Sequence, residues 1–96
     1  MPSYFLAQIN IVDPEGYEKY LEKFDAVFKR YNGRVIAVDD AITVLEGTWP
    51  FIRTVLIEFP SESALRDWYD SVEYQAIAKH RRDASIANIV VVHGRE

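Results

Sequence analysis

One short basic run contains the residue type best suited to acid–base chemistry at neutral pH. His80 stands in the run 79–82 (Lys-His-Arg-Arg), and an unperturbed imidazole titrates at about pH 6.5. His80 follows Ile77 by three residues and Tyr74 by six, so it can face inward on a helix and serve as a general acid or base. The same run also suits the C-terminal end of a helix, where cations are favoured. Both interpretations are open.

Two further candidate residues lie on either side of a turn in the middle of the chain. Glu46 precedes the turn 47–50 (Gly-Thr-Trp-Pro), and Arg53 follows it. In a site, Arg53 would hold a substrate carboxylate in a bidentate clamp and Glu46 would act as an acid or base. A cross-strand salt bridge between the two is the simpler interpretation, because ion pairs of this kind often have no catalytic role. Glu58 and Arg53 point to opposite faces of a regular strand and are not expected to pair.

Aromatic hydroxyls supply further candidates. Tyr69 and Tyr74 lie on either side of a predicted helix break at Asp70-Ser71, where they can present hydroxyl groups to the mouth of a cleft and orient a ligand. Trp68 continues an apolar helical stripe. We therefore expect its indole in the core.

Side-chain amides interrupt otherwise apolar strands. Gln8, Asn10 and Asn88, together with Arg53, are expected on one mixed face of the sheet, and isolated polar groups among apolar ones are typical of small-molecule pockets. The alternative is that these groups hydrogen-bond to one another, or to a second copy, and so determine the register of packing.

Several kinds of chemistry lack their sequence signatures. The chain has no cysteine, no glycine-rich phosphate loop, no Gly-x-Ser-x-Gly and no His-Glu-x-x-His, and its two histidines are far apart. No metal or other cofactor is therefore expected. A net charge of −4 opposes nucleic-acid binding. We expect no signal peptide and no membrane span, and hence a cytoplasmic location.

The elements that must position these residues follow from periodicity. Ninety-six residues make a single domain, 1–96. Strands are predicted for 3–12, 51–59 and 84–93, and a helix is expected to begin at Asp13-Pro14 and end at Asn32-Gly33, with Gly33 left-handed. A second helix capped by Ser61 breaks at Asp70-Ser71, where Ser71 caps a continuation to about Arg82. Residues 34–38 and 42–46 form either a hairpin or one bent strand.

The predicted order is β-α-β-β-α-β, which is the ferredoxin-like fold of the α+β class. Right-handed crossovers place the helices on one face of the antiparallel sheet. The other face of such a sheet should be polar in a monomer, but the strands are mostly apolar on both faces. We therefore expect a homodimer in which a second copy covers the sheet face.

Ordered sequence blocks resemble one known family. They are Val44-Leu45-Glu46-Gly47, Ile57-Glu58-Phe59-Pro60-Ser61, Trp68-Tyr69-Asp70-Ser71 and Glu73-Tyr74-Gln75, with Asp13-Pro14, Tyr17, Tyr20, Gly33, Pro50 and Arg53. Over nearly its whole length the chain resembles the bacterial family labelled domain of unknown function 1330. The resemblance implies the dimeric α+β barrel superfamily, whose members include cofactor-independent monooxygenases, lactone isomerases and small-molecule sensors. No catalytic motif of that superfamily carries over residue by residue.

Two functions are compatible with these observations. In the first, a homodimer binds a small, largely apolar molecule bearing a carboxylate or carbonyl. Such a protein would be an isomerase or monooxygenase-like enzyme if it is an enzyme, with His80 or Glu46 moving protons and Arg53 holding an anion. In the second, the protein is a non-catalytic sensing or interaction module with a filled barrel. A solvent-connected void of roughly 300 Å³ with convergent polar groups would favour the first.

Overall fold

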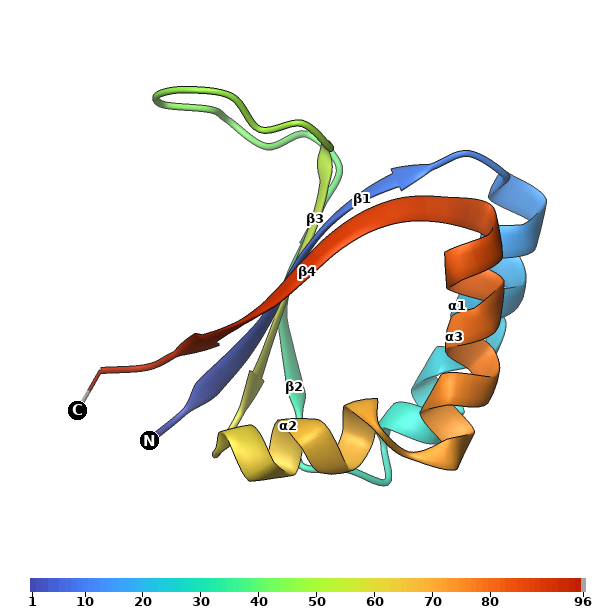
Figure 1. The fold of residues 1–96 in the computed structure, drawn as a ribbon, viewed down its shortest axis with the longest axis vertical. Coiled ribbons are helices and arrows are strands. Elements are labelled where there is room, and N and C mark those ends of the chain that lie inside the picture. The colour runs from blue at the N-terminus through green and yellow to red at the C-terminus, as the bar shows by residue number, and fades with distance from the viewer. Residues whose placement is uncertain (96) are drawn as a thin grey trace.

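Four strands form one antiparallel sheet, and the helices lie on one side of it (Figure 1). The structure is a computed structural model in which residues 1–95 are described. Along the chain the elements are β1 (Ser3–Ile11), α1 (Pro14–Phe28), β2 (Arg34–Asp39), β3 (Arg53–Phe59), α2 (Glu62–Tyr69), α3 (Val72–Ala84) and β4 (Ser85–His93). The strand order β2-β3-β1-β4 is that of the ferredoxin-like fold, so the predicted fold class is confirmed.

The register of the sheet separates a buried face from an open one. On the side of the helices, Phe5 of β1 lies opposite Ile57 of β3, and both side chains are buried. On the other side, Leu6 lies between Leu56 of β3 and Val90 of β4, and no helix covers this row (Figure 1). The alternation of residues along each strand therefore places apolar side chains on both faces, as the sequence indicates.

The core centres on Trp68, which is completely buried. Its indole lies 4.2 Å from the ring of Tyr74 and stacks on Phe59 at 5.4 Å, measured between ring centroids. Phe5 meets the same indole edge-on at 5.2 Å. Aromatic pairs with these geometries add to the stabilisation from buried area. The expected core position of Trp68 is confirmed.

Two serines determine how the second helical region is divided. The Ser61 hydroxyl accepts a hydrogen bond from the Ala64 amide at 3.1 Å, at the start of α2. The Ser71 hydroxyl accepts from the Tyr74 amide at 3.0 Å and donates to the Trp68 carbonyl at 2.7 Å. Each serine satisfies an amide that the first turn of a helix leaves unpaired. The predicted break at Asp70-Ser71 is therefore confirmed.

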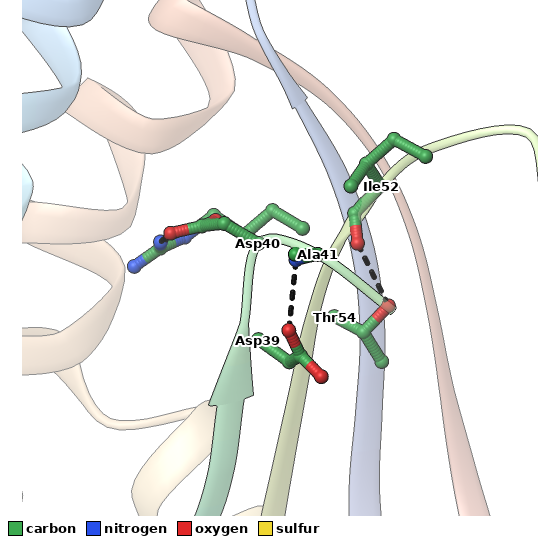
Figure 2. A network of polar contacts seen from close by, with 6 residues as sticks. Asp39, Asp40, Ala41, Ile52 and Thr54 are labelled. Atoms are coloured by element: carbon green, nitrogen blue, oxygen red, sulfur yellow. Dashed lines mark hydrogen bonds and ion pairs between the residues drawn. The ribbon is translucent and has the colours of Figure 1, made fainter. Parts of the chain in front are cut away.

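The segment after β2 differs from both predicted alternatives. Residues 42–46 form no strand; instead, β2 ends at Asp39 and a loop projects away from the helices before β3 begins at Arg53 (Figure 1). The carboxylate of Asp39 accepts a hydrogen bond from the Ala41 amide at 2.8 Å, and this local turn ends the strand (Figure 2). The only bend within β2 is a register shift between Val35 and Ala37.

The end of α1 also corrects a prediction. The helix stops at Phe28, and Gly33 does not adopt the left-handed conformation; within residues 1–95, Gly47 alone among glycines has a positive φ, 77°. Gly33 is needed for space, because a Cβ there would lie 2.6 Å from the rings of Phe28 and Phe59. Glycine is needed at this position because it has no side chain to collide with the two rings, and not because of its conformational freedom.

Within residues 1–95, no helix is long and apolar enough to cross a membrane. In the same residues, no three histidine, cysteine or acidic side chains gather as they would around a metal ion.

Candidate functional site

A cavity of about 300 Å³ lies between α1 and the helix-facing side of the sheet. Most of its wall is apolar, with Leu21 and Phe24 on α1 opposite Val38, Val55 and Ile57 on the sheet. Its polar groups are few: Tyr17, Tyr20 and Asp25 of α1, Arg53 of β3 and Arg81 of α3. An apolar cavity with a few polar groups that converge on it is the usual form of a small-molecule site.

Arg53 reaches the cavity because it shares the helix-facing side of β3 with Val55 and Ile57. The sequence had placed it with Gln8, Asn10 and Asn88 on the open face, and that placement is wrong. The register puts Arg53 opposite Ile9, a buried residue, whereas its neighbour Thr54 lies opposite Gln8 on the open face.

The partner of Arg53 is Asp40, not Glu46. Its Nη1 atom donates to both carboxylate oxygens of Asp40, at 2.9 and 3.0 Å, and its guanidinium carbon lies 5.6 Å from the centre of the Tyr17 ring. Glu46 is exposed on the projecting loop. The predicted salt bridge therefore fails because the segment that was to carry Glu46 as a strand is a loop. Figure 2 shows the side chains of Asp39 and Asp40 pointing away from the backbone in opposite directions.

Arg81 is the most deeply buried charged residue at the cavity. It is 4% exposed, and its Nε is buried without a hydrogen-bond partner. The guanidinium carbon lies 5.9 Å from the centre of the Tyr20 ring. Burial tends to lower the pKa of Arg81, but the phenol oxygens of Tyr74 and Tyr20 outweigh this effect and raise the pKa. Arg81 therefore carries a full positive charge. No ion pair joins it to a carboxylate within residues 1–95.

Two tyrosines meet beside this guanidinium. The hydroxyl oxygens of Tyr20 and Tyr74 lie 2.9 Å apart, and both side chains are buried. Burial raises the pKa of Tyr20 well above its ordinary value, and burial likewise raises the pKa of Tyr74. Both phenols are therefore neutral at neutral pH, where they serve as hydrogen-bond donors and acceptors.

The other candidate residues are spread over separate surfaces. His80 is half-buried on α3 but is not part of the cavity wall. Tyr69 lines a smaller pocket of about 220 Å³ between α2 and β4. Asn10 is exposed, and the Asn88 amide nitrogen donates to the Gln8 carbonyl oxygen at 3.1 Å on the open face. Of the predicted site residues, the structure brings Arg53 to the cavity and Tyr74 to the tyrosine pair behind it.

Sequence reasoning missed Arg81, Tyr17, Tyr20 and Asp25 as polar groups of the cavity. The signal for Arg81 was present: the buried residues of α3 are Tyr74, Ile77, Ala78, Arg81 and Ala84, spaced three, one, three and three. That spacing is the inward stripe of a helix. His80 lies one position off the stripe, so its position three residues after Ile77 was a misleading guide.

Comparison with known proteins gives a family but no activity. Residues 2–95 match the family described as "Domain of unknown function (DUF1330)". None of the curated proteins compared with the chain matches it.

Solved structures share the fold. A protein of unknown function from Rhodopseudomonas palustris superposes with a TM-score of 0.78 at 20% identity, covering 99% of this chain and 83% of that one. SnoaB, a cofactor-independent oxygenase from Streptomyces nogalater, superposes with a TM-score of 0.66 at 18% identity, covering 99% of this chain and 94% of that one. A dabb family protein with a ferredoxin-like fold from Mesorhizobium loti superposes with a TM-score of 0.67 at 9% identity, covering 99% of this chain and 98% of that one.

At these identities the structures establish a common architecture, and architecture alone does not carry an activity. Membership rests on the sequence match, which extends over almost the whole chain. The protein belongs to the family of the domain of unknown function DUF1330.

Proposed function

We propose that the protein binds a small, largely apolar organic molecule in the cavity between α1 and the sheet. The observation that carries the proposal is the cavity itself: about 300 Å³ of space with apolar walls, reached by two arginines and two tyrosines. Ligand sites in proteins begin at roughly this volume and use few polar groups to orient the ligand. The void is on the helix side of the sheet, inside one subunit.

Acid–base chemistry on such a ligand is the reaction class that we favour if the protein is an enzyme. SnoaB is described as a cofactor-independent oxygenase, and the likeness of fold supports asking whether this chain also catalyses a reaction. Asp25 is the carboxylate in the cavity wall. Neither His80 nor Glu46 lines the cavity, so Asp25 is the proton-transfer group that we propose for a ligand bound there. His80 and Glu46 stay proposals for proton transfer outside this cavity, and we expect His80→Gln and Glu46→Gln to leave binding in it unchanged.

We also propose that the functional unit is a homodimer joined through the open face of the sheet. Val90 and Val92 on this face are 52% and 42% exposed, and Leu6 and Leu56 complete a continuous apolar strip with them. Soluble monomers rarely expose contiguous apolar patches larger than a few hundred Å². A second copy, packed sheet to sheet, removes this strip from water.

A neutral fluorescent probe tests the binding proposal. N-phenyl-1-naphthylamine brightens when it leaves water, and we expect saturable binding to the full-length protein with one site per chain. Val55→Phe places a larger side chain in the cavity wall and should abolish that binding. Val72→Phe is the matched control, because Val72 is 83% exposed on α3 and does not line the cavity. Equal binding by the two variants, or none by the wild type, would contradict the proposal.

A further inference from the structure

We infer that the ligand of the cavity is an organic carboxylate whose carboxylate group pairs with the guanidinium of Arg81. The inference rests on the proposed function and names the charge and anchoring residue of its ligand. It selects between the carbonyl and carboxylate compounds that the sequence leaves open.

The two arginines of the cavity differ in whether a carboxylate pairs with them. Arg53 has its own carboxylate, because both oxygens of Asp40 accept hydrogen bonds from it. Arg81 is more deeply buried, yet it has no carboxylate partner within residues 1–95. Asp25 also lines the cavity, but it is exposed and forms no ion pair with Arg81. The buried end of the cavity is therefore electropositive.

A buried guanidinium without a counter-ion is costly, since desolvation of a charge is repaid only by a well-placed opposite charge and hydrogen bonds. The face of Tyr20, 5.9 Å away, compensates part of this cost. The Nε of Arg81 is left without any hydrogen-bond partner. A carboxylate offers two coplanar oxygens and a negative charge to the fork of a guanidinium, whereas a single neutral carbonyl group offers one oxygen and no charge.

The tyrosine pair supplies a second polar contact at the same end. Between Tyr20 and Tyr74 only one hydroxyl hydrogen is used, at 2.9 Å, so the other is available to donate. Tyr20 itself lines the cavity. One unpaired cation with one hydroxyl donor suits a monocarboxylate, and the apolar wall formed by Phe24, Val55 and others suits its hydrocarbon body. A phosphate monoester, with close to two negative charges at neutral pH, carries more charge than this single cation balances.

The experiment compares two ligands that differ in charge and little else. Binding of 2-naphthoate and of 2-naphthamide is measured by calorimetry on the full-length wild type, Arg81→Met, Arg81→Lys and Arg82→Met. Arg82 is the matched control, because it is the next residue of α3 but is exposed and bonds to Gln75. Binding of the neutral N-phenyl-1-naphthylamine shows that each variant still folds around its cavity.

We expect the wild type to bind the naphthoate about tenfold or more tightly than the amide, the range of a charge-assisted hydrogen bond. This preference should disappear in Arg81→Met, fall in Arg81→Lys and persist in Arg82→Met. Equal affinity for acid and amide, or a preference that survives Arg81→Met, would overturn the inference. The inference would also be overturned if neither 2-naphthoate nor 2-naphthamide bound while N-phenyl-1-naphthylamine did. If no probe binds at all, the proposed function itself fails.

Discussion

The hydroxyl oxygens of Tyr20 and Tyr74 lie 2.9 Å apart although the two residues are separated by 54 positions. Their hydrogen bond joins α1 to α3, and the guanidinium carbon of Arg81 lies 5.9 Å from the centre of the Tyr20 ring. The hydrogen bond connects the helix that forms one wall of the cavity to the helix that carries its buried cation. The pair therefore positions the site and stabilises the fold at the same time.

Removing either hydroxyl should destabilise the protein. We expect Tyr20→Phe and Tyr74→Phe each to lower the free energy of unfolding by about 1–2 kcal/mol, because each leaves a buried hydroxyl without its partner. The double variant should cost less than the sum of the two, which a double-mutant cycle in urea measures. Tyr31→Phe is the control, since the Tyr31 hydroxyl bonds to Glu73 at an exposed position. Strict additivity would show that the pair is not coupled.

The same tyrosines make stability depend on alkaline pH. Burial raises the pKa of Tyr20 well above its ordinary value of 10.0, so the unfolded chain releases this proton at a lower pH than the folded chain does. The stabilisation is fully present below about pH 10 and is lost as the pH rises toward the folded-state pKa. Urea midpoints measured from pH 7 to 11 should fall above about pH 10, and less steeply in Tyr20→Phe. Parallel curves for both proteins would contradict the assignment.

The strands and helices could largely be predicted because each depends on local features. The Ser71 cap, the stripe that contains Trp68 and the alternation along β1 are properties of neighbouring residues, and the structure confirms all three. The projecting loop could not be predicted in the same way. Residues 42–46 are rich in strand-forming types, but β-propensity depends on having a neighbouring strand to pair with.

The candidate site was harder to predict because it depends on which face each residue meets. Arg53 was placed on the wrong side of the sheet, and His80 was chosen where Arg81, one residue further, points inward. A shift of one position turns a side chain by about 100° on a helix and by half a turn on a strand. The partner of Arg53 was also inaccessible to pattern reasoning, since Asp40 is a loop residue brought near it by tertiary structure.

A charge on the open face of the sheet should separate the two subunits. We expect the wild type to have about twice the 11.1 kDa mass of the chain in light scattering. Leu6→Glu, at the centre of the apolar strip, should give the mass of one chain, because an unpaired carboxylate would be buried in the interface. Val72→Glu introduces the same change at an exposed position on α3 and should leave the mass unchanged. A monomeric wild type would contradict the homodimer.

Replacing Arg81 by an apolar side chain tests whether the protein retains this cation for binding or for stability. We expect Arg81→Met to leave the thermal midpoint unchanged or to raise it by a few degrees, because methionine fills similar space without a charge to desolvate. Arg82→Met changes an exposed residue and should have little effect. Excess 2-naphthoate should raise the midpoint of the wild type by more than that of Arg81→Met, because the stabilisation by a ligand grows with its affinity for the folded protein. A fall of several degrees in Arg81→Met would instead assign the guanidinium to the packing of Tyr20 and Tyr74.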